Sequence, residues 1–186
     1  MTIHIRTIDA IEGPRLVEPD VFGDARGYFK ETFRASLLDG LGVESFLQDN
    51  ESFSAKGVLR GLHYQLEPHS QAKLVRCLRG AVFDVLVDIR VGSPTFGKWL
   101  GYELSAENHR MLFLPKGFAH GFVALQDDTL IQYKQSAYYE PASERSIAWN
   151  DPNIGIDWPV TDPLISEKDK LAPKLGEAEN NFSWKG

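Results

Sequence analysis

The sequence has little of several features that define common protein classes. A single cysteine, Cys77, stands among 186 residues, so an internal disulfide framework is excluded. No apolar run reaches the length of a membrane span, and the first ten residues, MTIHIRTIDA, lack the apolar core of a signal peptide. We therefore expect a cytoplasmic protein without a membrane partner.

Positive charge is also in short supply. Aspartate and glutamate number 26 against 20 lysines and arginines, which gives a formal net charge of -6 at pH 7. Because nucleic acid is a polyanion, this balance disfavours general binding to it. An anionic small molecule could still bind where a few cationic side chains converge.

Several familiar cofactor and catalytic motifs are missing. The chain contains no G-x-G-x-x-G run, no P-loop and no G-x-S-x-G elbow, which weakens nicotinamide, nucleotide-hydrolysing and serine-hydrolase interpretations. Cys77 lies in an apolar strand pattern and is predicted to pack rather than to act as a nucleophile. We find no repeat or linker, so residues 1–186 are predicted to form a single domain.

Helical periodicity is scarce, whereas short strand patterns are frequent. The clearest, VFDVLVDI, places Phe83, Val85 and Val87 on one face, which predicts a strand with a dry side. Helices are expected only near 35–41 and after Ser166, a potential helix cap. Strands are predicted at Val82–Ile89, Tyr28–Phe33, Val58–Gln65, Lys73–Leu78, Gly97–Leu104, Met111–Leu114, Gly121–Leu125 and Thr129–Ser136.

These patterns predict a mostly β fold, a sandwich or barrel with a few short helices. From about residue 171 the chain becomes polar and loses periodicity, which favours a peripheral arm or a frayed tail over another core element.

Polar residues gather in the stretch GVLRGLHYQLEPHSQAK, residues 57–73. Strand alternation puts Arg60 and Tyr64 on one side and His63 on the other. Gly61 would leave room beside His63 for a ligand to approach the backbone. A second cluster, LPKGFAHGF, delivers His120 after a turn, and Arg26, Arg60 and Lys73 could supply positive charge for a diphosphate.

Each of these residues also has an ordinary structural explanation. A histidine such as His63 or His120 is more often hydrogen-bonded within the fold than catalytic. Tyr133 could be a half-buried strand aromatic with a satisfied hydroxyl group. The charged side chains could be solvated on the surface.

A metal site is a separate possibility, because His63, His69 and His120 occur on a predicted β scaffold. The β-barrels called cupins often carry a His-x-His pair, followed by a glutamate and a later histidine. Here the pair reads His63-Tyr64-Gln65, and glutamine is a poor ligand for a transition metal. We therefore predict no bound metal, although P-x-G-x-x-H at 115–120 is consistent with the barrel itself.

Seven motifs in order resemble the dTDP-4-dehydrorhamnose 3,5-epimerase family, from about residue 19 to residue 173. They are FGDARGYFKETF, QDNESFS, VLRGLHYQ, the strand that begins at Lys73, LPKGFAHGF, YYEPASERSIAWNDP and ISEKD. The resemblance implies a cupin-type jelly roll that forms a homodimer. An N-terminal strand is exchanged in that dimer, so each active site borrows residues from the partner subunit.

The resemblance also assigns residues to roles. It implies that His63 is the base, assisted by Asp169, and that Tyr133 is the acid. It implies that Tyr139 stacks on the thymine of a dTDP-sugar. The remaining residues that it places around the substrate are Arg26, Glu31, Gln48, Asn50, Arg60, Lys73, His120, Glu144 and Lys168.

The implied activity is a cofactor-independent isomerisation. It inverts C3 and C5 of dTDP-4-dehydro-6-deoxy-D-glucose and gives dTDP-4-dehydro-L-rhamnose, a step of dTDP-L-rhamnose biosynthesis. Three alternatives stay open: a single-site epimerase or ketoisomerase acting on a related dTDP-sugar, a noncatalytic sugar-nucleotide binding barrel, and a metal-dependent cupin dioxygenase.

Overall fold

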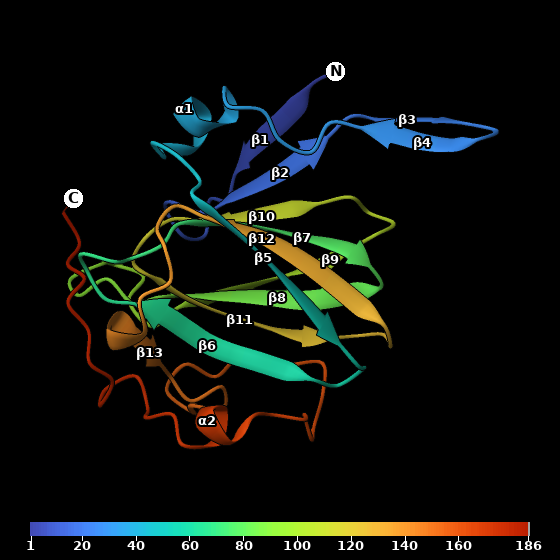
Figure 1. The fold of residues 1–186 in the computed structure, drawn as a ribbon. Helices are drawn as coiled ribbons and strands as arrows, with labels where there is room; N and C mark the ends of the chain where they lie inside the picture. Colours follow the sequence, from blue (N-terminus) through green and yellow to red (C-terminus); the bar gives the residue numbers. More distant parts are fainter. Residues whose placement is uncertain (186) are drawn as a thin grey trace.

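Two antiparallel β-sheets packed face to face form the body of the molecule (Figure 1). This computed structural model describes residues 1–185. The six-stranded sheet has the order β1 (Ile3–Thr7), β2 (Arg15–Pro19), β10 (Met111–Leu114), β7 (Lys73–Arg79), β12 (Thr129–Gln135) and β5 (Gln48–Ser54). The five-stranded sheet has the order β13 (Glu144–Ser146), β6 (Leu59–Gln65), β11 (Phe118–Ala124), β8 (Ala81–Asp88) and β9 (Trp99–Ser105).

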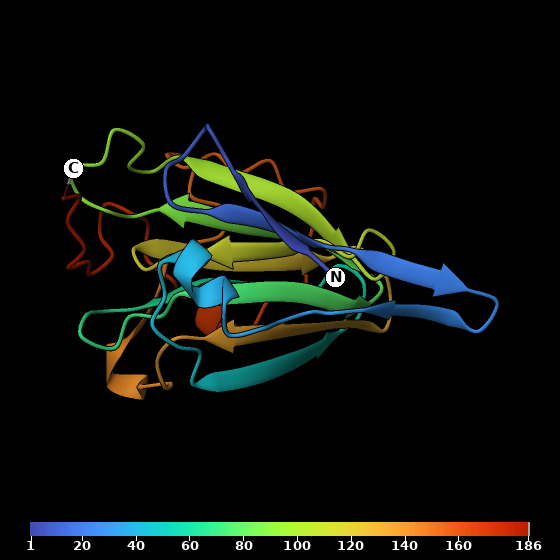
Figure 2. The same ribbon diagram turned by 90° about the horizontal axis from the view of Figure 1, so that it is seen from above.

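Strands β3 (Val21–Asp24) and β4 (Gly27–Lys30) form a hairpin that projects away from the sheets (Figures 1 and 2). The helices are short: α1 covers Leu37–Leu41, α2 covers Glu167–Lys170, and Pro141–Ser143 form one 3-10 turn. No helix in residues 1–185 is long and apolar enough to cross a membrane. The predicted architecture, a cupin-type jelly roll with a few short helices, is confirmed.

The eight predicted strands all occur with small changes of their ends, whereas five short strands were not predicted. The strand expected at Tyr28–Phe33 begins at Gly27 and stops at Lys30. The missed strands are β1, β2, β3, β5 and β13. Strand β5 reads QDNESFS, which looks like a loop because its apolar content is low. It is a strand because β12 pairs with it along its whole length, and such tertiary pairing overrides local propensity.

Strand β8 corrects the expectation of a single dry side. Val85 and Val87 pack in one apolar cluster, whereas Val82 and Leu86 pack in another, so both faces of the strand are buried. Buried carboxylates must have partners, and Asp88 accepts hydrogen bonds from Arg90, Ser93 and Thr95. The polar alternation in VFDVLVDI thus reflects paired buried acids rather than a solvent-facing side.

Two expectations for β6 were wrong: that Gly61 leaves room for a ligand, and that Arg60 and His63 point to opposite sides of the strand. A Cβ atom on Gly61 would lie 2.5 Å from Cα of Gly121, so the neighbouring strand β11 takes the space that was assigned to a ligand. The register between β6 and β11 also shifts here. Such a bulge re-aims side chains, so Arg60 and His63 line the same cavity despite their odd spacing.

The residues after 171 run along the outside of the barrel as an arm (Figure 1). Phe182 is buried in the core cluster that also contains Tyr64. The Tyr64 hydroxyl donates to the carbonyl of Glu179 at 2.5 Å, and Asn180 donates to the carbonyl of Ile89. Trp184 lies against the guanidinium of Arg90. This segment is therefore anchored along its length rather than frayed.

Candidate active site

A cavity of about 460 Å³ opens between the two sheets. The five-stranded sheet contributes His63, Arg60 and His120 to its lining, and the six-stranded sheet contributes Lys73 and Tyr133. The segment that leads into α2 closes one side. The other lining residues are Ser52, Val58, Leu59, Phe122, Leu164, Ile165, Ser166 and Asp169.

His63 is paired with a carboxylate delivered by α2. Its Nε2 lies 2.6 Å from Oδ1 of Asp169, a residue that is almost fully buried. The cap predicted at Ser166 is confirmed, since its hydroxyl accepts from the Asp169 backbone N–H and starts the helix at Glu167. Burial raises the pKa of Asp169, but the hydrogen bond and charge of His63, together with the bonds from Ser166 and the Gly61 backbone, outweigh it and leave that pKa lowered. Asp169 is thus a fixed anion, and with Nε2 donating to it, Nδ1 keeps the lone pair that a base requires.

His120 forms a second histidine–carboxylate pair deeper in the fold. Its Nε2 lies 2.8 Å from Oδ1 of Asp84, and the two side chains are 7% and 0% exposed. Oδ2 of Asp84 has no hydrogen-bond partner among the described residues. Asp84 was not among the predicted site residues. An acid in the middle of an otherwise apolar strand was the signal that could have found it.

Lys73 and Tyr133 lie together on the six-stranded sheet, on the paired strands β7 and β12. The Lys73 Nζ is 5.9 Å from the centre of the Tyr133 ring. Burial lowers the pKa of Lys73 to about 8, and the nearby carboxylates of Asp84 and Glu144 oppose that change. At neutral pH the amine therefore carries most of its positive charge in a poorly hydrated place, where it can stabilise a developing anion strongly.

A smaller cavity of about 150 Å³ shares His63, Lys73 and Tyr133 with the larger one and extends toward Tyr139 and Glu144. The Tyr139 hydroxyl donates to Oε2 of Glu144 at 2.8 Å, and Lys168 pairs with Oε1 at 2.6 Å. Burial raises the pKa of Glu144, but the bonds from Lys168 and Tyr139 and the charges of Lys168 and His63 leave it lowered.

The amides and the arginine predicted at the site take up distinct positions. Asn50 faces Tyr133 across the β5–β12 pairing and lines the smaller cavity. Gln48 donates to Asn50 and accepts the backbone N–H of Tyr139, so it holds the segment that carries that ring. Arg60 is exposed at the rim, where it donates to Ser54 and to the carbonyl of Phe53.

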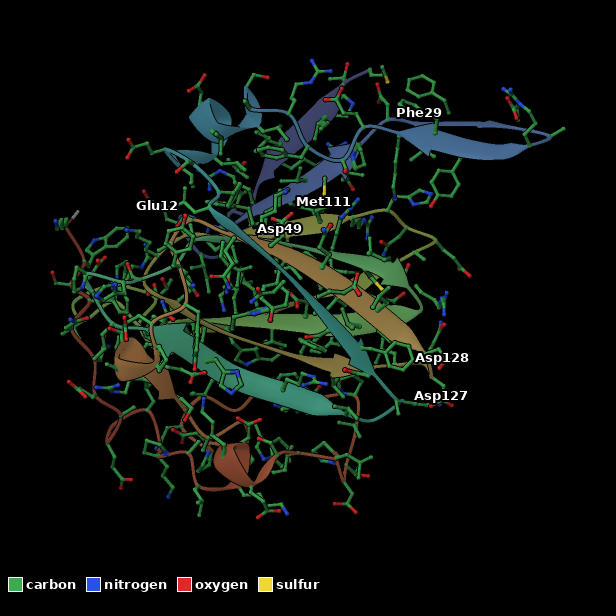
Figure 3. The ribbon with its side chains drawn as sticks, in the orientation of Figure 1. Glu12, Phe29, Asp49, Met111, Asp127 and Asp128 are labelled. Carbon is green, nitrogen blue, oxygen red and sulfur yellow. The ribbon has the colours of Figure 1, made fainter. Side chains whose placement is uncertain are left out.

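Four predicted residues line neither cavity: Gln48 and Lys168 bond to residues that do, whereas Arg26 and Glu31 lie on or beside the projecting hairpin. Arg26 lies at the tip of the β3–β4 hairpin with its side chain 89% exposed and paired with Asp24. Glu31, just after β4, pairs with Arg34. Figure 3 shows Phe29 on the same hairpin, far from the space between the sheets.

Gln65, which stands where metal-binding cupins often carry a second histidine, has a structural task. Its amide nitrogen donates to the carbonyls of His69 and Tyr138, and its oxygen accepts from the backbone N–H of Glu140. The side chain thus brackets Tyr139 from both neighbouring residues. Both the amide nitrogen and the amide oxygen are therefore engaged by backbone groups, and two of the three bonds go to the loop beside the cavity.

The chain matches known proteins along nearly its whole length. The family model of dTDP-4-dehydrorhamnose 3,5-epimerase matches residues 9–177. The dTDP-4-dehydrorhamnose 3,5-epimerase of Shigella flexneri is 55% identical over 167 residues, which cover 88% of this chain and 92% of that protein.

Two solved structures show the same fold with dTDP-sugars bound. The dTDP-6-deoxy-D-glucose-3,5-epimerase of Legionella pneumophila, in complex with dTDP-4-keto-L-rhamnose, is 48% identical with a TM-score of 0.90 and covers 95% of this chain and 94% of its own. A 3'-monoepimerase of Streptomyces bikiniensis, in complex with dTDP-quinovose, is 40% identical with a TM-score of 0.87. The match covers 92% of this chain and 87% of the monoepimerase chain. The chain belongs to the dTDP-4-dehydrorhamnose 3,5-epimerase family of isomerases.

Proposed function

We propose that this chain inverts C3 and C5 of dTDP-4-dehydro-6-deoxy-D-glucose and so produces dTDP-4-dehydro-L-rhamnose for dTDP-L-rhamnose synthesis. One observation carries the assignment of roles: His63 and Tyr133 come from opposite sheets and line the same cavity. Inversion needs a proton to leave one face of the sugar and another to arrive on the opposite face. A base and an acid on facing walls supply both groups.

His63 is the proposed base. The C4 ketone of the substrate acidifies the hydrogens on C3 and C5, so a neutral imidazole can remove one of them. The electron pair of the broken C–H bond moves into an enolate on the C4 oxygen, and the imidazole becomes an imidazolium. Asp169, 2.6 Å from Nε2, orients the ring and stabilises this cation.

Tyr133 is the proposed acid, and Lys73 stabilises the enolate. The Tyr133 hydroxyl gives its proton to the carbanionic carbon from the face opposite His63, which restores the ketone with inverted configuration. The ammonium of Lys73 lies close to Tyr133 and offers its charge to the enolate oxygen. Solvent then resets both protonation states. No net oxidation occurs, so the reaction consumes no redox cofactor.

Binding of the nucleotide involves the residues around this centre. Tyr139 is half exposed beside the smaller cavity and can stack on thymine, an interaction worth about 1–3 kcal/mol in nucleic-acid sites. Arg60 stands at the rim with a guanidinium suited to the diphosphate. Gln48, Asn50, His120, Glu144 and Lys168 complete the proposed substrate contacts.

Arg26 and Glu31 are proposed to act in the site of a second subunit. They lie on or next to the projecting hairpin, where Val21, Phe22, Tyr28 and Phe29 expose apolar side chains. An apolar patch of this kind favours association, and a homodimer that exchanges this N-terminal segment would bring Arg26 to the partner's cavity. Sedimentation analysis of a Phe22→Ser, Phe29→Ser double variant tests this idea, since it should be monomeric. We also propose a cytoplasmic location, which cell fractionation tests.

The decisive experiment for the reaction is proton exchange in heavy water. Incubation of the purified chain with dTDP-4-dehydro-6-deoxy-D-glucose should place deuterium at both C3 and C5, as followed by NMR. An active preparation that exchanges neither carbon would defeat the proposal.

A single-site epimerase is the second candidate, because a 3'-monoepimerase is among the similar structures. It would use the same acid and base and differ in how the sugar is held. Deuterium confined to C3 in the product would favour it.

A further inference from the structure

The carboxylate of Glu144 joins the nucleotide side of the cavity to the helix that carries Asp169. One of its oxygens accepts from the Tyr139 hydroxyl at 2.8 Å. The other lies 2.6 Å from Nζ of Lys168, the residue next to Asp169 on α2. Both oxygens of one side chain are therefore used, one toward the proposed thymine site and the other toward the histidine–aspartate pair.

Helix α2 depends on such contacts for its position. It has four residues, too few for a helix to be stable alone, and Asp169 is its one buried member. Before it, the backbone of Leu164 bonds to Gly57 and Leu59, and after it the carbonyl of Pro173 accepts from Ala148.

Between these anchors, two ion pairs join α2 to the barrel among the described residues, Asp169 with His63 and Lys168 with Glu144, and the Asp169 side chain also bonds to the backbone of Gly61. Lys170 pairs only with Glu167 of the same turn. Loss of the Lys168 contact therefore leaves the bonds of Asp169 itself, to His63 and to the Gly61 backbone, as the polar side-chain contacts between α2 and the barrel.

The strand pairing makes this arrangement stiff on the barrel side. Glu144 opens β13, which pairs with β6 so that Glu144 faces Gln65 and Ser146 faces His63. The side chain of Glu144 is 23% exposed, whereas that of Asp169 is 3% exposed. Glu144 thus lies on a strand that is paired with the strand of His63. Its ion pair with Lys168 holds α2 in place relative to these two strands.

We propose that Glu144 is a positioning residue that holds Asp169 on His63 through Lys168, and that its second bond, to Tyr139, couples nucleotide binding to the alignment of the base. This rests on the proposed role of His63. Catalytic geometry is sensitive to small displacements, and a shift of about 1 Å can cost up to a hundredfold in rate. A nucleotide that stacks on Tyr139 fixes the ring whose hydroxyl bonds to Glu144, so nucleotide binding and base alignment are energetically linked.

The test uses three variants of the full chain, one control and Asp169→Ala as the reference for a lost bond to His63. Lys168→Met and Glu144→Gln break the ion pair, whereas Lys168→Arg keeps the charge and restores it. Glu179→Gln is the control, because it breaks the Arg145–Glu179 pair, one residue along β13, without reaching α2. The first readout is the ¹⁵N signal of the His63 ring in the protein without substrate, which reports its bond to Asp169. The second is the separate change of kcat and KM.

We expect Lys168→Met and Glu144→Gln to move the His63 ring signals toward those of Asp169→Ala and to lower kcat about tenfold. Lys168→Arg should recover at least half of kcat, and Glu179→Gln should leave both readouts unchanged. Ring signals that stay fixed while only KM rises would overturn the proposal, because Glu144 would then act on substrate binding alone and not on the base. Failure of the proposed function is seen separately, as full turnover in His63→Ala.

Discussion

The two histidine–carboxylate pairs differ in where their acids come from and in how far they are buried. His63 is 30% exposed, and Asp169 reaches it from a short helix near the end of the chain. His120 is 7% exposed, and Asp84 reaches it from the adjacent strand of the same sheet. One pair is more exposed to the cavity and takes its acid from a separate short helix, whereas the other lies within a single sheet.

This difference suits the more exposed pair to proton transfer and the buried pair to a structural role. A base must present a lone pair to substrate and must accept the charge of a proton, which requires access and an adjacent anion. The exposed pair meets both needs. The deep pair joins β8 to β11 by a buried contact within the five-stranded sheet. The following predictions test that division, beginning with the largest expected effect.

Replacing each of the two histidines should give the largest difference in kcat. His63→Ala should lower kcat by about 10²–10⁴, the usual contribution of a general base, whereas His120→Ala should lower it about tenfold. Steady-state kinetics with the dTDP-sugar measures both, and circular dichroism checks that each variant is folded. Equal losses would mean that both imidazoles move protons.

Tyr133→Phe should separate proton removal from inversion. Without the hydroxyl, kcat should fall about a hundredfold, but His63 should still exchange the substrate's protons with solvent. Deuterium should therefore appear in recovered substrate with its configuration retained. Loss of this exchange as well would place Tyr133 in the removal step and contradict its role as the acid.

The pH dependence of kcat/KM should report the protonation state of Lys73. Burial favours the neutral amine, so its pKa falls to about 8, and the cationic form is present below that value and lost above it. The value of kcat/KM, which reports the free enzyme, should fall as pH rises through about 8. In Lys73→Arg the charge persists and this decline should move to higher pH. A decline that stays at the same pH in that variant would assign it to another group.

Asp84→Ala should affect stability more than turnover. The substitution leaves the ring nitrogen of His120 buried without its acceptor, which costs about 1–3 kcal/mol of unfolding free energy. Asp169→Ala should cost less stability, because His63 can bond to water instead. Urea unfolding measures both, and the reverse order would contradict the assignment of the deep pair to architecture.

Sequence patterns were sufficient for strands with strong apolar alternation and for the helix cap at Ser166. They failed for β5, whose polar residues form a strand only because β12 lies beside it. They also failed at Gly61, where the bulge against β11 brings Arg60 and His63 to one cavity. Local periodicity contains no information about either neighbour.

For the site, the residue types were visible in the sequence but their convergence was not. The pairing of His63 with Asp169 joins positions 106 residues apart, and only the ordered family motifs suggested it. Asp84 was not predicted as a site residue, because alternation predicts the face of the strand on which a side chain lies and not the residues that it contacts. The predicted roles of the site residues stay predictions until the variants above are measured.

The strand order of the larger sheet has a consequence for how quickly the chain reaches this fold. Strand β2 pairs with β10, and β5 pairs with β12, so partners far apart in the chain must meet before this sheet is complete. Long loops must close before their contacts contribute, which makes such topologies fold in milliseconds to seconds rather than microseconds. Stopped-flow refolding should accordingly show a slow main phase, and sequence changes in distant turns should alter it little.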